Sequence, residues 1–397
     1  MAQFNRRQFL VGSSVLGALG VAGGSVISWD ELHHRAATAP LSPGTGVLVL
    51  VTMYGGNDGV NTVIPYADNA YHDARPELAY RPEDVLHLDG QLGLNPAMKG
   101  FAQLWNTRNL AIVRGVGYQH PDHSHFRSMD IWQTASPDSP VQTGWIGRWL
   151  DATGDDPVRA VNVGPVLPQL ALGEKYTAAA LDPTTTPLPR ELSTALAGLA
   201  ATDPHDSPAQ GFVCAGYRAE QAVTRTFSSI APKSPAPEAN PLAAQLALVG
   251  QCVKAGVPTR VYSVSLGGFD THADERRTQQ QLLGRLDEAV SAFLSDLHGH
   301  PRGRDVVVLA YSEFGRRVAA NASQGTDHGT AGPVFVAGAP VKGGFYGDEP
   351  SLTDLDNGDL KTTVDFRDVY SELLHRVLAT DPGPVVGAAR HELGLIT

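Results

Sequence analysis

The sequence predicts an α/β fold in which a mostly parallel sheet lies between layers of helices. Three observations support this prediction. The 397-residue chain is long enough, and with 42% hydrophobic residues apolar enough, for one large core. Short apolar runs rich in β-branched residues recur along the chain, and helical patterns separate them. This alternation is typical of parallel strands joined by crossover helices.

The predicted strands are short apolar runs. The first, residues 45–53 (TGVLVLVTM), is almost continuously apolar, as expected of a strand that is buried on both faces. Five more runs follow, at residues 109–115, 158–164, 259–267, 305–312 and 333–338. Because ligands bind such sheets at the carboxyl ends of the strands, the residues after each run are the candidates for function.

The predicted helices lie between these strands. The clearest is residues 273–297, where Leu282, Leu286, Val290 and Phe293 recur on one face. Others are expected at residues 96–106, 124–135, 240–255 and 365–379. Residues 181–240 are rich in Pro, Thr, Ala and Ser and lack strong periodicity. We expect them to form a surface insertion or cap in a single α/β domain that spans residues 40–397.

The first 39 residues resemble a twin-arginine export signal. Arg6 and Arg7 precede an apolar, glycine-rich segment, and Ala37-Thr38-Ala39 fits a cleavage site after Ala39. We therefore expect export by the twin-arginine machinery to the periplasm or the exterior, with no stable membrane span after cleavage. An uncleaved membrane anchor is the alternative.

Charge and cysteine content limit the partners. The net charge is −11 and no basic run follows the first residues, so a nucleic-acid partner is not expected. The two cysteines, Cys214 and Cys252, form one disulfide or remain two buried thiols. Neither has a neighbouring Cys or His in sequence, which argues against a cysteine metal site.

Polar residues that can bind metals follow the predicted strands. Their carboxylates and imidazoles suit zinc, whereas oxygen ligands alone suit magnesium, calcium or manganese. The sequence therefore predicts a site for one or two divalent metal ions. The candidate metal ligands are Asp58, Asp270, His272, Glu313 and His328. The candidate catalytic residues are Asn57, His123, Ser124, His125, Arg127 and Arg316.

Each candidate also has a structural interpretation. Asp58 suits the cap of a glycine turn, and Ser124 suits the N-cap of the helix predicted at 124–135. Asp270 suits the cap of the next helix, and Glu313 suits a salt bridge to Arg316 or Arg317. The stretch ASQGTDHGTAG at residues 322–332, with Asp327 and His328, has the composition of a polar turn.

The ordered motifs resemble a known family. MYGGNDGVNTVIPY, HSHFRSMDIWQTA, GGFDTHADE, SEFGRR and TDHGTAGPVFVAG are similar to the motifs of the exported bacterial family called domain of unknown function 1501. That family is placed in the alkaline phosphatase and sulfatase superfamily. The resemblance implies a mostly parallel sheet with two metal ions at the carboxyl ends of its strands.

The resemblance also implies roles for individual residues. Asp58 corresponds to the first metal-binding aspartate, Ser124 to the nucleophile, and His328 to the last histidine ligand. Asp270 and His272 resemble the ligands of the outer metal. Glu313 stands where many members have the aspartate of an Asp-His pair, and Phe314 replaces the histidine. One ligand is then missing or comes from another segment, which favours a harder metal or a single ion.

The function expected from these residues is hydrolysis of a phosphate or sulfate ester. Ser124 would attack a small anionic ester or glycan substrate, Asn57, Arg127 or Arg316 would contact its oxygens, and His123 or His125 would protonate the leaving group. The alternative is an exported binding or accessory protein with a reduced metal site. The chain has no G-x-S-x-G motif around Ser124 and no G-x-G-x-x-G after the first strand, which disfavours a serine triad and a dinucleotide site.

Overall fold

The computed structural model describes residues 25–26, 29–154, 156–164, 166–181, 240–387 and 390–397. The Arg6-Arg7 pair, Cys214 and nearly all of the predicted insertion at 181–240 lie outside this description. The chain divides into two compact units, which we describe separately. Among the described residues, no helix combines the length and the apolar character that a membrane crossing requires.

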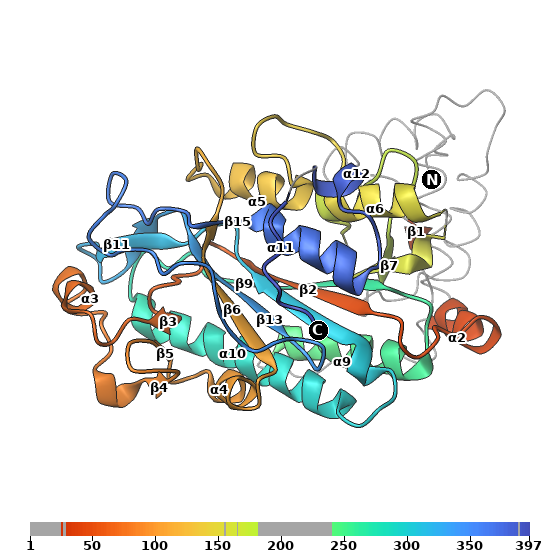
Figure 1. Ribbon diagram of the computed structural model, residues 1–397, viewed down its shortest axis with the longest axis horizontal. Coiled ribbons are helices and arrows are strands. Elements are labelled where there is room, and N and C mark those ends of the chain that lie inside the picture. The colour runs from red at the N-terminus through yellow and green to blue at the C-terminus, as the bar shows by residue number, and fades with distance from the viewer. Residues whose placement is uncertain (1–24, 27–28, 155, 165, 182–239, 388–389) are drawn as a thin grey trace, which may run out of the picture. The chain divides into compact units, whose positions relative to one another are not determined.

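The larger unit contains a mixed, mostly parallel sheet, which confirms the predicted fold class (Figure 1). β2 and β10 are parallel neighbours, and β6 is parallel to the short strands β14 and β15. β13 runs antiparallel to both β10 and β6. The strand order is β9 (Val261–Gly267), β2 (Val47–Tyr54), β10 (Val306–Tyr311), β13 (Gly332–Ala337), β6 (Leu110–Gly117) and β14 (Gly344–Tyr346), and β15 (Val364–Asp365) also pairs with β6.

Helices cover both faces of this sheet (Figure 1). One face carries α4 (Lys99–Asn106), α9 (Pro241–Ala255) and α10 (Glu275–Leu297), and the other carries α5 (His125–Thr134) and α11 (Phe366–Glu372). β10 is buried along its whole length and β2 along all but its last residue, because helices lie on both sides. On α10 the predicted apolar residues are buried, namely Leu282, Leu286, Val290 and Phe293. The helix predicted at 365–379 begins as α11 and continues as a π-helix over Leu373–Val377.

Two small sheets, which the apolar pattern did not predict, complete the larger unit. One is the hairpin of β11 (Arg316–Ala320) and β12 (Thr326–His328). The other contains β3 (Val63–Ile64), β5 (Gly93–Leu94) and β4 (Leu86–His87) and lies near α3 (Asn69–Ala74) in the sequence. The stretch at 322–332 is therefore more than a polar turn, since its central residues form β12.

The smaller unit includes residues 142–181 and 255–262 among those described. Its strands β1 (Ser25–Val26), β8 (Ala179–Leu181) and β7 (Ala160–Val163) are parallel. α6 (Trp145–Thr153) contributes two fully buried tryptophans, Trp145 and Trp149. α2 (Trp29–Thr38) lies within the predicted signal, and its Arg35 forms an ion pair with Asp156.

Candidate functional site

The segments that follow β2 and β9 approach each other closely in the larger unit. Gly55 follows β2 with a φ of +118°, and a Cβ atom at this position would lie 2.5 Å from the backbone nitrogen of Asp270. Only glycine permits both this backbone conformation and this contact. The first glycine of the GGNDG motif therefore allows the loop after β2 to lie against the Asp270 segment.

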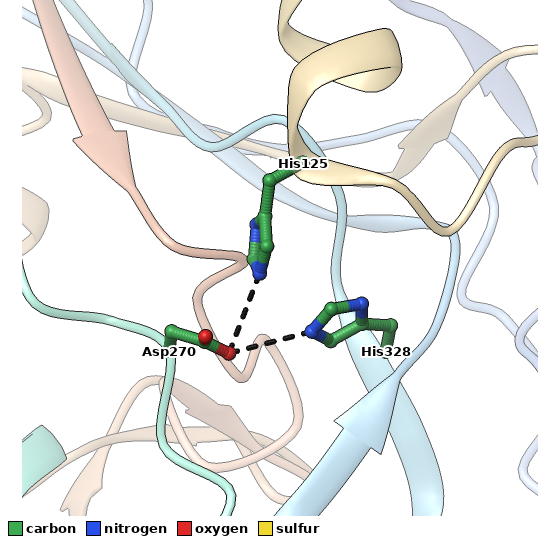
Figure 2. A group of neighbouring side chains, drawn as sticks. All are labelled: His125, Asp270 and His328. Carbon is green, nitrogen blue, oxygen red and sulfur yellow. Dashed lines mark hydrogen bonds and ion pairs between the residues drawn. The ribbon is translucent and has the colours of Figure 1, made fainter.

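The carboxylate of Asp270 is the centre of the site. Its Oδ1 lies 3.0 Å from Nε2 of His272, 3.3 Å from Nε2 of His328 and 3.4 Å from Nε2 of His125. Figure 2 shows the rings of His125 and His328 both directed at this carboxylate. The guanidinium of Arg316 lies 2.7 Å from the same oxygen. We call His125, Asp270, His272 and His328 the Asp270 cluster.

Arg316 positions Asp270 from inside the protein. Its side chain is fully buried, and burial alone would raise the pKa of Asp270. The hydrogen bond and charge of Arg316 outweigh this effect and lower that pKa to about 2, so Asp270 is ionised. The nitrogens of Arg316 also donate to four backbone carbonyls, those of Gly55, Gly56, Phe269 and Thr326. The predicted contact between Arg316 and substrate oxygens does not agree with these bonds, because the guanidinium is committed to the protein.

Glu313 lies behind His125 and does not face Asp270. Its Oε1 accepts hydrogen bonds from Nδ1 of His125 at 2.8 Å and from the backbone nitrogen of Gly55 at 2.9 Å. Its Oε2 accepts from the hydroxyl of Ser312 at 2.9 Å. Glu313 is buried, and both oxygens are engaged. The structure thus gives Glu313 the role of orienting a histidine in place of the predicted role of metal ligand.

The contact with Glu313 fixes which nitrogen of His125 faces the cluster. Since the carboxylate accepts, Nδ1 carries the hydrogen, and the neutral ring presents the lone pair of Nε2. That Nε2 is buried and has no hydrogen-bond partner among the described residues. The hydrogen bond that His125 donates to Glu313 raises the pKa of His125 and outweighs the opposing effect of burial.

The ring of His328 also has Nε2 facing Asp270, but a backbone carbonyl holds it in place of a carboxylate. Its Nδ1 donates to the backbone carbonyl of His123 at 2.7 Å, so the neutral ring also presents the lone pair of Nε2. Burial lowers the pKa of His328, and the positive charge of Arg316 adds to that effect. His272 completes the group, with its Nε2 2.9 Å from Nε2 of His328 and its Nδ1 3.7 Å from the carboxylate of Asp327.

The Asp270 cluster fits a divalent metal ion. The ligand atoms offered by His125, Asp270 and His328 lie within 4.8 Å of one another. Two lone pairs and an ionised carboxylate face one point, an arrangement that a cation stabilises. A histidine whose other nitrogen donates to a carboxylate or a backbone carbonyl is also the usual arrangement of a metal ligand. Imidazole and carboxylate ligands together suit zinc.

Asp58 and Asn57 lie apart from the cluster. Asp58 is fully buried, and Arg75 binds both of its carboxylate oxygens. The side-chain nitrogen of Asn57 donates to Thr62 at 2.9 Å. The structure does not bring either residue to the cluster, because its polar atoms are used inside the fold. Arg75 carries no motif signal, so sequence reasoning missed it.

Ser124 occupies the predicted N-cap of α5. Its hydroxyl accepts from the backbone nitrogen of Arg127 at 3.5 Å, and its side chain is exposed. The side chain of Arg127, a predicted contact to substrate oxygens, forms an ion pair with Asp130. Ser124 lies between two histidines that buried carboxylates hold.

His123, the first of these histidines, has a carboxylate partner of its own. Its Nε2 lies 2.8 Å from Oδ2 of Asp359, which is 4% exposed. Asp359 is 236 residues away in sequence, and no spacing in the chain links it to His123. Sequence reasoning therefore missed this partner as well.

A family model matches part of the chain. Residues 194–389 match the family model described as Protein of unknown function (DUF1501), which confirms the predicted family resemblance. The match includes Asp270, Glu313 and His328 and begins after Ser124. No curated protein matches the chain.

Solved structures with a similar arrangement include three bacterial proteins. A protein in the alkaline phosphatase superfamily from Vibrio parahaemolyticus is 10% identical, with 90% of this chain and 76% of that chain covered and a TM-score of 0.43. The lipoteichoic acid synthase LtaP from Listeria monocytogenes is 10% identical, with 91% and 81% covered and a TM-score of 0.39. The C-terminal periplasmic domain of EcEptC from Escherichia coli, in complex with Zn, is 11% identical, with 75% and 74% covered and a TM-score of 0.34.

Proposed function

We propose that the protein is an exported hydrolase of phosphate or sulfate esters that acts at the Asp270 cluster with a bound divalent metal. The observation that carries this proposal is the convergence of Nε2 of His125 and Nε2 of His328 on the ionised carboxylate of Asp270. Each ring is held by a hydrogen bond from its other nitrogen. Such a site supplies positive charge to an anionic ester, for which a metal ion acts as a Lewis acid.

Ser124 is the proposed nucleophile. It precedes His125 directly, and its exposed hydroxyl lies at the N-terminus of the ten-residue helix α5, where the helix dipole favours a negative oxygen. In the proposed reaction the Ser124 oxygen, after loss of its proton to solvent, bonds to phosphorus or sulfur as the ester bond breaks. Water then hydrolyses the enzyme ester. The net reaction consumes one water and releases an alcohol and phosphate or sulfate.

His123 is the proposed acid for the leaving group. His125 is committed to Glu313 and to the cluster, whereas the side chain of His123 is 44% exposed. The contact between its Nε2 and Asp359 leaves Nδ1 to hold and deliver a proton. Protonation of the leaving oxygen matters most for alcohols that leave poorly.

The proposal is tested by a screen of the full-length protein with added Zn²⁺, Mn²⁺, Mg²⁺ or Ca²⁺. The substrates are p-nitrophenyl phosphate, bis-p-nitrophenyl phosphate and p-nitrophenyl sulfate, and the Asp270→Ala variant is the control. We expect turnover of one ester class, lost in Asp270→Ala. Equal turnover in both proteins would refute the site. Metal binding without turnover of any ester would refute the hydrolase.

A second candidate is a binding protein on the same scaffold, which would hold an anionic ester or glycan without turnover. One observation favours it: Arg75 occupies Asp58, so the cluster has fewer free carboxylates than the family resemblance implies. Isothermal titration of the metal-loaded protein with a sulfated or phosphorylated oligosaccharide separates the two candidates. Binding without any product supports this second function.

Export remains a proposal from the sequence. We infer that the twin-arginine machinery recognises Arg6 and Arg7 and carries the protein to the periplasm or the exterior. The replacement of both arginines by lysines is expected to retain the protein in the cytoplasm. Cell fractionation with an antibody to the chain measures this outcome.

A further inference from the structure

We propose that the site holds one divalent ion per chain and not two, because a buried guanidinium takes the place of a second cation beside Asp58. The inference rests on the metal site of the proposed function but not on turnover. It also assigns the ligand set: Nε2 of His125, the carboxylate of Asp270 and Nε2 of His328.

A second ion would need carboxylates of its own. In sites with two ions the metals lie about 3.5–4 Å apart and each has separate ligands. Among the metal ligands predicted from the sequence, Asp58 and Glu313 are the carboxylates other than Asp270. Whether Asp58 and Glu313 are free to bind a metal therefore decides whether the site can hold a second ion.

Asp58 is already neutralised by a permanent cation. Arg75 binds its two oxygens through two different nitrogens, and the side chains of both residues are fully buried. The backbone nitrogen of Val60 also donates to Oδ1 at 3.2 Å. Arg75 is itself fixed by donation to the carbonyls of Val318 and Arg317, both at 2.7 Å. Arg75 thus engages both oxygens of a fully buried carboxylate and cannot leave them to a metal without disrupting β11, whereas Arg316 engages one oxygen of Asp270, whose side chain is 48% exposed.

Glu275 encloses Asp58 from another direction. It hydrogen bonds to the carboxylate of Asp58 and accepts from the hydroxyl of Thr326 at 2.6 Å. Burial and the charge of Asp58 raise the pKa of Glu275 to about 9, so it carries a proton at neutral pH and donates to Asp58. Arg75 and Glu275 together therefore occupy the surroundings of the Asp58 carboxylate that a second ion would need.

Glu313 is also excluded as a ligand. Its two oxygens accept from Nδ1 of His125, from the backbone of Gly55 and from the hydroxyl of Ser312. If Glu313 turned toward a metal, His125 would lose the contact that orients its ring. The carboxylate therefore serves the single ion indirectly, through His125.

The remaining donors suit one ion. A four-coordinate zinc ion with bonds of about 2.0–2.2 Å places its ligand atoms about 3.3–3.6 Å apart. The Oδ1 of Asp270 lies 3.3 Å from His328 and 3.4 Å from His125, and 3.0 Å from His272. The separations of Asp270 from His328 and His125 are thus close to those that one tetrahedral ion requires, whereas His272 lies closer, at 3.0 Å from Asp270 and 2.9 Å from Nε2 of His328.

The number of ions can be measured without any substrate. The full-length protein is stripped with a chelator and titrated with Zn²⁺ in a calorimeter, and its metal content is then determined by elemental analysis. Titration with Co²⁺ adds an absorption spectrum that reports four-coordinate nitrogen and oxygen ligands. We expect one equivalent of each metal. Two equivalents of similar affinity, or none, would overturn the inference.

Substitutions in the Asp270 cluster test whether its residues bind the ion. Asp270→Asn and His328→Ala are expected to weaken binding by more than the ~10–100-fold that loss of an outer partner costs. Asp58→Asn is the matched control, expected to bind one equivalent with unchanged affinity, and circular dichroism checks that it is folded. Loss of the ion from folded Asp58→Asn, with Asp270→Asn unaffected, would contradict the ligand set. If Asp58→Asn does not fold, the wild-type stoichiometry and the two cluster variants still decide.

The outcomes separate this inference from the proposed function. One ion without ester hydrolysis supports the single-ion centre and refutes the hydrolase. Two ions with hydrolysis supports the hydrolase and refutes the single-ion centre.

Discussion

The Oε1 atom of Glu313 lies 2.8 Å from Nδ1 of His125, so a buried carboxylate holds a histidine whose other nitrogen faces Asp270. This contact joins the end of β10 to the start of α5. It explains how a chain with Glu-Phe at the end of this strand can still present a histidine to the Asp270 cluster. The histidine comes from another segment, and the carboxylate supports it from behind.

Replacement of Glu313 by Gln is expected to weaken metal binding by about 10–100-fold, the usual cost of losing an outer partner of a histidine ligand. The amide keeps the shape of the side chain but no longer holds His125 with a charged acceptor. Titration of the stripped protein with Zn²⁺ measures the change. Glu288→Gln, at an exposed position on α10, is the control and should leave the affinity unchanged. An unchanged affinity in Glu313→Gln would remove the supporting role of Glu313.

Replacement of Arg316 by Lys is expected to destabilise the protein by about 1–3 kcal/mol, the cost of leaving a buried acceptor without its donor. Lysine keeps the charge but cannot reach the carbonyls of Gly55, Gly56 and Thr326 together. Urea unfolding followed by circular dichroism measures the loss. The neighbouring Arg317→Lys is the control, because Arg317 is 41% exposed, and a change within about 0.5 kcal/mol is expected. Similar losses in both variants would contradict the role of Arg316.

Replacement of Ser124 by Ala is expected to abolish turnover while the protein still binds one metal ion. The Ser124 N-cap bond is long, at 3.5 Å, so the stability loss should lie near the lower end of the ~0.5–2 kcal/mol typical for caps. Ser124→Asn separates the two roles, since asparagine caps helices well but has no hydroxyl. Hydrolysis of the p-nitrophenyl esters and thermal unfolding measure both effects. Full activity in either variant excludes Ser124 as the nucleophile.

The raised pKa of Glu275 predicts that the stability of the protein depends on pH. Its folded-state pKa of about 9 lies above the ordinary 4.5, so between these values the folded protein binds more protons than the unfolded chain, and stability falls as the pH rises. The pKa of its partner Asp58 is lowered: burial raises it, but Arg75 outweighs burial. Asp58 therefore acts only below its ordinary value of 3.8, outside this window.

Glu275→Gln should remove this part of the dependence. The amide donates to Asp58 and accepts from Thr326 without a titrating proton. The melting temperature of wild type relative to the variant is expected to fall between pH 5 and pH 9. Thermal unfolding at several pH values tests this, because contributions from other groups are common to both proteins. A constant difference across the range would contradict a protonated Glu275.

The sequence by itself determined the main elements and most of the cluster. The continuous apolar run of β2 and the helical spacing on α10 have direct physical causes, since a strand covered on both faces must be apolar and a surface helix buries one stripe. Asp270 and His272 could be predicted because residues that follow the strands of such a sheet share one edge, whereas His328 was predicted from the polar segment in which it lies and belongs to the hairpin strand β12.

Only the tertiary structure decided what each polar group faces. Glu313 and His125 are 188 residues apart, Arg316 reaches carbonyls up to 261 residues away, and Arg75 meets Asp58 through a network centred on β11. The pattern of apolar residues shows which face of a strand or helix is buried. It does not show which groups form hydrogen bonds or ion pairs with a carboxylate. Those partners depend on how loops from distant segments pack, because a buried charge must find a donor wherever the fold supplies one.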